Sequence, residues 1–347
     1  MTTRDGRVAS IVPIVALFVT LAAATTAAAQ EPVATGFVMQ NRSPFAAIIG
    51  VPGRWPDNSA NIAELSWNAS SHAKAETSAG FASIVDGETH SLTARFQFPV
   101  LQRFRVGLQL PWISHSGGFL DSTIDTWHEI FGLNEGIRPQ VPRNELNYVL
   151  DRQGAEVYRL SDSTSGIGDV QVGLTADLGS FDRNAKPGTV GGYLLRMPWR
   201  LSLNVKLPTG DIDKLTGSGE TDVSLGVGWR SPDDTDGRLR WWLDAGVTLP
   251  GDVDIAALQT ESQVYYYDGA LTWRLTNRFD LIAQLAGHSR LYAGDVADLG
   301  RTAAQLAIGG LWHMSPRFGL RFGFYEDVIA ESAPDFGFEL SLLIRRW

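Results

Sequence analysis

The sequence predicts an all-β fold: a transmembrane antiparallel β-barrel of about twelve strands, with one short helix in a long extracellular insertion. Three observations predict it. Apolar and polar residues alternate in many segments, the connections between these segments are alternately short and long, and aromatic residues gather beside the short connections. Alternation with period two is typical of strands, and bacterial outer-membrane barrels combine short periplasmic turns with long extracellular loops.

The first 29 residues are predicted to be a signal peptide. Arg4 and Arg7 precede an apolar run over residues 8–24, and Ala27 and Ala29 form an A-x-A cleavage site. These are the parts of a secretory signal. An uncleaved anchor helix is the alternative, but a proline interrupts the run. The expected location is the outer membrane, reached after the signal peptide is cleaved.

Residues 30–60 are predicted to form an N-terminal plug or a periplasmic leader. The segment is apolar and rich in turn residues, and it does not alternate. The plug is favoured because the apolar side chains of this segment would otherwise meet water. The predicted plug residues are Asn41, Arg42, Ser43, Pro44 and Phe45.

Residues 61–347 are predicted to form the barrel. In "RLSLNVKL", Leu203 and Val205 share one face, and Ser202 and Asn204 share the other. The twelve predicted strands cover 61–74, 88–99, 103–113, 166–179, 190–207, 221–231, 238–250, 262–276, 278–291, 301–314, 317–327 and 335–346. The apolar face is expected to meet lipid and the polar face the lumen.

A soluble β-sandwich would bury the same apolar face in a core. The distribution of aromatic residues favours the barrel, because a sandwich core has no reason to place them at one height. The predicted girdle at the periplasmic interface contains Phe104, Trp229, Trp241, Trp273, Phe279, Trp312 and Phe318. The chain also ends on an aromatic residue, Trp347, which resembles the terminal signal of outer-membrane barrels. Trp347 has the parity opposite to Phe338 and Leu340, so the end of this strand is expected to bend or to carry a bulge.

A basic ring is predicted in the periplasmic half of the lumen. Its members are Arg103, Arg105, Arg230, Arg240, Arg274, Arg321 and Arg345. Three acids share this region: Glu64, Asp177 and Asp280. One interpretation is structural, with cross-strand ion pairs filling a narrow barrel. The other is functional, because a ring of positive charge selects anions in a pore.

The insertion over residues 114–165 is predicted to carry a helix over 121–131. Its apolar stripe consists of Leu120, Ile124, Trp127 and Phe131, and its polar positions include Asp121, Asp125, His128 and Glu129. The apolar stripe is expected to pack on the barrel mouth, which makes the helix a lid. Asp125, His128 and Glu129 are also a candidate Ca²⁺ or Mg²⁺ site, although acids on an exposed helix face are ordinary. We predict no metal and no cofactor.

The chain is not expected to be an enzyme. His90 has outward parity near Ser83 and Ser91, as in a lipid-acting barrel enzyme, but no serine is well placed on the neighbouring strand and no G-x-S-x-G motif occurs. With no cysteine, the chain can form no disulfide and no thiolate nucleophile. A net charge of −9 argues against a nucleic-acid partner.

Four motifs resemble a bacterial outer-membrane barrel family catalogued as domain of unknown function 3187. They are "NRSPF", "GGFLDSTIDTWHEIFGL", "GIGDVQVGL" and "KLPTGD…TGSGETDVSLGVG". The resemblance spans nearly the whole mature chain and implies a membrane barrel in the outer membrane. It implies no activity and no substrate. The N-terminal plug is more distantly similar to the fatty-acid and aromatic-hydrocarbon channels, an analogy of fold alone.

The expected function is a gated channel or transporter for a small amphipathic or anionic solute. The alternatives are a structural or envelope-assembly barrel without transport, and a lipid-acting outer-membrane enzyme. The expected partners are the lipid bilayer and lipopolysaccharide, the barrel-assembly machinery during biogenesis, and a small solute that the sequence does not identify.

Overall fold

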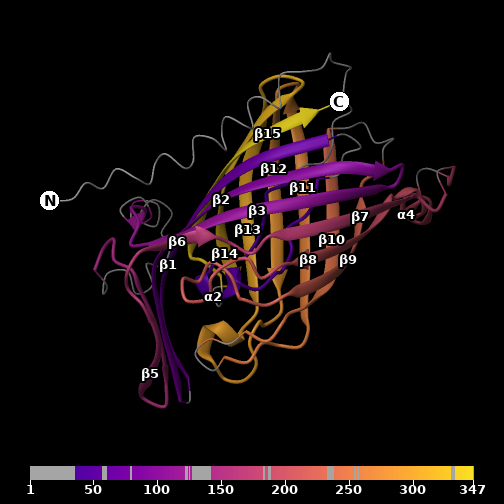
Figure 1. Ribbon diagram of the computed structural model, residues 1–347. Helices are drawn as coiled ribbons and strands as arrows, with labels where there is room; N and C mark the ends of the chain where they lie inside the picture. Colours follow the sequence, from indigo (N-terminus) through magenta and orange to yellow (C-terminus); the bar gives the residue numbers. More distant parts are fainter. Residues whose placement is uncertain are drawn as a thin grey trace.

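The computed structural model describes residues 36–56, 61–78, 80–121, 124, 126, 142–182, 184–186, 189–232, 238–253, 255, 258–329 and 333–346. In this part of the chain, fifteen strands join one antiparallel sheet, and twelve of them close into a barrel (Figure 1). The barrel closes because β1 pairs with β2 on one side and with β15 on the other. The predicted twelve-stranded barrel is confirmed.

The barrel strands follow the chain in order. They are β1 (Asn61–Ser78), β2 (Phe81–Leu101), β3 (Phe104–Ser116), β7 (Gln171–Gly179), β8 (Trp199–Lys206), β9 (Asp222–Arg230), β10 (Leu239–Leu249), β11 (Val264–Thr276), β12 (Phe279–His288), β13 (Ala303–His313), β14 (Phe318–Ile329) and β15 (Phe336–Arg346). The other elements are α2 (Pro44–Ala47), β4 (Asn147–Arg152), β5 (Ala155–Leu160), β6 (Thr164–Ile167), α4 (Val190–Arg196) and the 3₁₀ turn η2 (Ala297–Gly300).

The alternating sequence gives each barrel strand two different faces. On β1, the side chains of Glu64, Ser66 and Asn68 point inward and are almost fully buried, whereas those of Leu65 and Trp67 point outward. The outward girdle residues Phe104, Trp273 and Trp312 are 41%, 52% and 47% exposed. Polar side chains buried inside and large apolar ones exposed outside are the reverse of a soluble protein, and they suit a barrel surrounded by lipid.

The first two strands are longer than predicted. Residues 75–87 were expected to be an extracellular loop, but β1 and β2 stay paired as far as Ser78 and Phe81. β4 pairs with the start of β2, and β5 pairs with β4. These strands extend beyond the barrel at the end opposite the C-terminus (Figure 1).

The predicted strand over 190–207 is wrong in its first half, where the structure has helix α4. Thr189 caps this helix, because its hydroxyl oxygen accepts a hydrogen bond from the backbone N–H of Gly192 at 3.0 Å. The helix ends at Arg196. Met197 is extended, as expected for a residue before proline, and β8 begins after Pro198.

Within the described residues, no helix is both long and apolar enough to cross a membrane.

Candidate functional site

The lumen of the barrel contains residues 36–56, the described part of the chain before the first strand. We call residues 36–56 the inner segment. Phe37, Phe45, Ile48 and Trp55 are 3%, 0%, 1% and 3% exposed. The segment contains one turn of helix, α2, which lies among the barrel strands (Figure 1). In the described chain, no strand pairing joins the inner segment to the barrel, so side chains hold it in place.

Two pairs of glycines receive the aromatic residues at the ends of the inner segment. Gly107 on β3 lies directly opposite Gly173 on β7, and the ring of Trp55 packs over both. Gly309 on β13 likewise lies opposite Gly323 on β14, under the ring of Phe37. A Cβ added at Gly107 would lie 2.6 Å from the Trp55 ring, so any larger side chain there would displace it.

Polar contacts fix the backbone between these two rings. Gln284 on β12 accepts from the N–H of Phe37 at 2.6 Å and donates to its carbonyl at 3.2 Å. Glu339 on β15 accepts from the N–H of Val38 at 3.0 Å. At the other end, the indole N–H of Trp55 donates to Asn204 on β8 at 2.6 Å. The inner segment is therefore bound to walls on several sides of the lumen.

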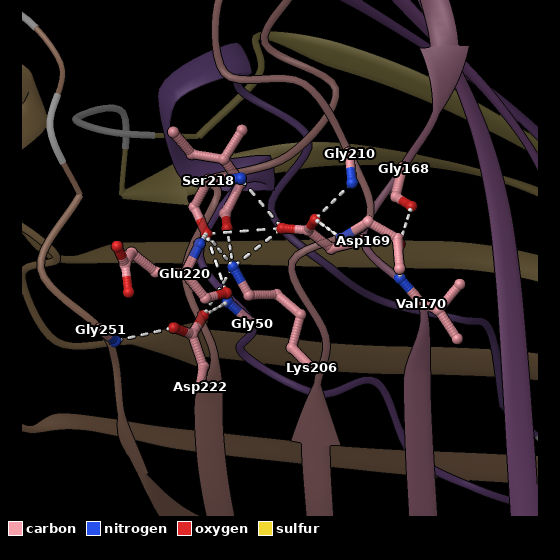
Figure 2. A network of polar contacts seen from close by, with 12 residues as sticks. Gly50, Gly168, Asp169, Val170, Lys206, Gly210, Ser218, Glu220, Asp222 and Gly251 are labelled. Atoms are coloured by element: carbon pink, nitrogen blue, oxygen red, sulfur yellow. Dashed lines mark hydrogen bonds and ion pairs between the residues drawn. The ribbon is translucent and has the colours of Figure 1, made fainter.

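A buried lysine joins the inner segment to two of the long connections between strands (Figure 2). The ammonium of Lys206, at the end of β8, lies 2.9 Å from Asp169 and 3.0 Å from Asp222. It also donates to the carbonyl of Ile48 at 2.7 Å and to the hydroxyl of Ser218. We call these residues the Lys206 node.

The two carboxylates of the Lys206 node are occupied by backbone N–H groups as well. Asp222 accepts from Gly50 of the inner segment and from Gly251, at 2.7 and 2.8 Å. Asp169 accepts from Gly210 and Ser218, at 2.8 and 2.9 Å (Figure 2). Two of the resemblance motifs, "GIGD" and "KLPTGD…TGSGETD", therefore meet at one buried charge cluster that also binds the inner segment.

An apolar cluster covers the inner segment at the mouth of the barrel that carries the long connections. Its residues come from the inner segment, the β4 hairpin and several loops, and they include Phe45, Ile48, Tyr148, Leu150, Leu215, Val253, Leu291 and Tyr292. Burial raises the pKa of Tyr292, so its hydroxyl stays protonated and donates to the carbonyl of Phe45 at 2.7 Å. The β4 hairpin lies over the mouth, whereas Leu120 and Ile124, the described apolar residues of the predicted lid, do not join this cluster.

A second charge network lies along one wall of the lumen, on the neighbouring strands β14, β15 and β1. The guanidinium of Arg321 lies 2.5 Å from Glu64 and 2.6 Å from Glu339, and all three side chains are at most 2% exposed. Arg95 lies 3.9 Å from Glu64 on its other side. Arg321 also lies over the ring of Phe37, 5.7 Å from its centroid. Arg321, one of the predicted ring arginines, therefore belongs to a buried network of ion pairs.

A cavity of about 830 Å³ lies at the opposite end of the barrel, beside the short turns. That end faces the periplasm in bacterial barrels. We call this cavity the vestibule. Five arginines and one acid, Asp177, are in its lining; the arginines are Arg54, Arg103, Arg196, Arg200 and Arg230. Arg54 and Arg200 share Asp244, each at 2.6 Å, so positive charge exceeds negative charge around the cavity.

The seven predicted ring arginines do not share one environment. Arg103 and Arg230 line the vestibule. Arg105 pairs with Asp177, Arg274 with Asp280 at 2.8 Å, and Arg321 with two glutamates. Arg345 donates to His313 at 3.2 Å, and Arg240 is partly buried near the end of β10. Sequence reasoning missed Arg196 and Arg200, although the predicted strand over 190–207 gives both of them lumen parity, and it missed Arg54 because that residue lies outside the predicted strands.

The predicted plug residues all lie in the lumen. Asn41, Arg42 and Ser43 are 9%, 5% and 7% exposed, Phe45 is fully buried, and Pro44 opens α2. The amide of Asn41 lies 2.9 Å from the Nε2 atom of His288 on β12.

The predicted lid is wrong for the part of its apolar stripe that the structure describes. Leu120 and Ile124 pack against Ala69 and Phe336, on the outward faces of β1 and β15, and not on the mouth. Asp121 accepts from the N–H of Asn144 at 2.8 Å. This outer packing arises because Glu88, also outward, accepts from the N–H groups of Phe119 and Leu120. The other predicted lid residues, Asp125, Trp127, His128, Glu129 and Phe131, lie outside the described residues.

His90 occupies the same outer surface. Its Nε2 atom lies 3.0 Å from Glu88, and its ring stacks between Trp67 and Phe119. Ser83 and Ser91 have the opposite parity and are buried. Ser114 on β3 does lie beside His90, contrary to the expectation that no serine would, but its hydroxyl donates to the carbonyl of Thr164 at 3.2 Å.

No group of three or more His, Cys, Asp or Glu side chains within the described residues is arranged to hold a metal ion.

A closed antiparallel barrel with an apolar outer wall and polar lumen defines a protein of the bacterial outer-membrane barrel class. A family model described as protein of unknown function (DUF3187) matches residues 11–345. The chain belongs to this family. None of the curated proteins matches it.

Solved structures are similar to this chain at low identity, and one of them has a TM-score above 0.5. An outer membrane channel from Pseudomonas putida F1 is 10% identical, with a TM-score of 0.51, and the match covers 83% of this chain and 96% of that one. NanC porin is 10% identical, with a TM-score of 0.44 and coverage of 83% and 100%. The toluene transporter TodX from P. putida is 10% identical, with a TM-score of 0.40 and coverage of 83% and 91%. These likenesses concern the fold alone.

Proposed function

We propose that the protein is an outer-membrane channel for a small anionic or amphipathic solute, and that its inner segment is the gate. The observation that carries this proposal is the inner segment itself. It lies buried in the lumen, yet side chains hold it and no strand of the described barrel pairs with it. A piece bound in this way can leave its position while the twelve strands keep their own hydrogen bonds.

The vestibule supports an anionic solute. Arg103 and Arg230 belong to different strand ends and face one cavity together with Arg196 of α4. Positive charge that lines a pore entrance raises the local concentration of anions. The size of the cavity, about 830 Å³, is in the range of small-molecule sites. The amphipathic part of the proposal rests on the apolar cluster that a solute would meet beyond the inner segment.

Planar bilayer recording tests this proposal with the mature protein. A variant without residues 36–56 is expected to conduct steadily and to prefer anions, and the complete protein is expected to conduct in rare openings. In the deletion background, Arg103→Glu with Arg230→Glu is expected to lower or reverse the anion preference. Arg278→Glu is the matched control, because Arg278 is exposed in a short turn outside the vestibule lining.

Two outcomes would count against the proposal. A deletion variant that is folded and remains silent would mean that the inner segment is not the gate. A cation-selective pore would contradict the proposal that the solute is anionic. Equal ion selectivity in the Arg103→Glu, Arg230→Glu variant and in the Arg278→Glu control would contradict it as well. Folding is checked independently by the heat-dependent migration of the barrel in gels.

The alternative is a structural or envelope-assembly barrel without transport. The buried network of Arg321, Glu64 and Glu339 favours it. This network joins β14 and β15 to β1, the strand with which β15 pairs to close the barrel. Silence in bilayers by every folded variant, together with a co-purifying envelope protein, would support this function. A lipid-acting enzyme is a second alternative, and it fails if His90→Ala leaves phospholipid and lipopolysaccharide acylation unchanged.

A further inference from the structure

Helix α4 presents an apolar face that nothing in the described chain covers. Val190, Leu194 and Leu195 are 80%, 53% and 45% exposed, and Phe181, in the preceding turn, is 74% exposed. In a helix, positions 190 and 194 lie on the same side, one turn apart, with 191 and 195 beside them. These side chains therefore form one continuous surface and not scattered single residues.

The opposite face of α4 is turned toward its own connection and toward the vestibule. Gly192 is buried, and a Cβ there would collide with the backbone carbonyl of Lys186. Arg196, on the same side, lines the vestibule. The helix is thus amphipathic in a fixed orientation, with its polar side toward the basic cavity and its apolar side away from the lumen.

The apolar face of α4 is continuous with the lipid-facing girdle. The indole N–H of Trp241, an outward residue of β10, donates to the hydroxyl of Tyr193 at 2.9 Å. The ring of Phe181 contacts Trp199 with centroids 5.3 Å apart, and Trp199 contacts Trp229 at 4.8 Å. Tryptophan and tyrosine side chains mark the level of the headgroups in membrane proteins.

We propose that α4 is an interfacial helix that inserts its apolar face into the periplasmic leaflet of the bilayer. Its ligand is the phospholipid at the boundary between headgroups and acyl chains, where apolar helix faces are buried about 5–10 Å deep. Lipid is the occupant because this surface extends one that lipid already covers. The helix thereby fixes Arg196, and with it one wall of the vestibule, at a constant height relative to the membrane.

Spin labelling tests the proposal directly, because the chain contains no cysteine and a single introduced one is unique. Leu194→Cys is labelled in the full-length mature protein, reconstituted in phosphatidylethanolamine–phosphatidylglycerol vesicles. Collision rates are measured with oxygen, which concentrates in acyl chains, and with a polar nickel chelate. Lys186→Cys, exposed in the same connection, is the matched control. Leu225→Cys, 53% exposed in the middle of β9, is the reference within the membrane.

The ratio of oxygen to nickel collisions at position 194 is expected to lie between the other two, and roughly twofold or more above that at position 186. A ratio at 194 equal to that at 186 would overturn the proposal, because the helix would then stand in water. Shielding of 194 from both reagents would also overturn it, since a protein partner or a second copy would then cover the face. All three positions are exposed, so the barrels are expected to fold, and gel migration verifies this.

Discussion

Replacing Lys206 with methionine is expected to destabilise the barrel by about 3–5 kcal/mol, the cost of removing one partner from a buried ion cluster. Lys206 is 3% exposed, and its loss leaves Asp169 and Asp222 facing each other without a cation. The same change removes the donor to Ile48, so the inner segment should loosen as well. Denaturant unfolding of the refolded barrel in detergent measures the first effect.

The matched control for this experiment lies in the same connection. Lys214→Met breaks a pair with Asp211 in which both side chains are about half exposed, at 50% and 42%. Exposed pairs contribute about 0–1 kcal/mol, so the control should unfold close to the wild type. Equal destabilisation by the two variants would show that burial does not strengthen the Lys206 node.

Trp55→Ala is expected to release the end of the inner segment from Gly107 and Gly173, the two glycines that the Trp55 ring covers. We call this pair the glycine slot. The ring is 3% exposed, and removing a buried tryptophan costs about 3–5 kcal/mol locally, with Asn204 left without its donor. Hydrogen exchange in residues 36–56 should accelerate strongly, and channel openings in bilayers should become more frequent. The barrel strands should exchange as slowly as before.

Gly107→Ala provides the reciprocal test of the same contact. The added methyl group meets the Trp55 ring, so this variant alone should also expose the inner segment to exchange. In a Trp55→Ala background the slot is vacant, and Gly107→Ala should then add little, a non-additivity expected only of residues in contact. Gly191→Ala, with nothing near the added atom, is the control. If the effects of Gly107→Ala and Trp55→Ala on hydrogen exchange were additive, the proposed contact between the Trp55 ring and Gly107 would be wrong.

The barrel could be predicted from periodicity because the alternation of apolar and polar residues can be recognised within each strand separately. Two-residue alternation in "RLSLNVKL" or "RFGLRFGFYE" states which face meets lipid, whatever the neighbouring strands do. The predicted strand boundaries were wrong where side chains no longer alternate between the two faces of a barrel strand. Residues 75–87 lie beyond the membrane, where both faces of the strands can be covered by other parts of the chain, and Val190–Arg196 form a helix stabilised by the Thr189 cap.

The site was less predictable, because it depends on contacts between distant parts of the chain. The apolar, turn-rich character of the N-terminal segment indicated a plug, but no local pattern shows that Trp55 requires Gly107 and Gly173. The stripe of Leu120 and Ile124 was read correctly as apolar and placed wrongly. Its partner is the outer wall of β1 and β15, and a helical period does not say which surface it will cover.

The position of the inner segment in the chain links its docking to the order of synthesis. It precedes all twelve barrel strands in the chain, yet the N–H of Val38 donates to Glu339 on β15, the last of these strands in chain order. A chain that ends before β15 lacks this acceptor and also the strand that pairs with β1. The inner segment can therefore make all its contacts in the lumen only after every barrel strand up to β15 has been synthesised.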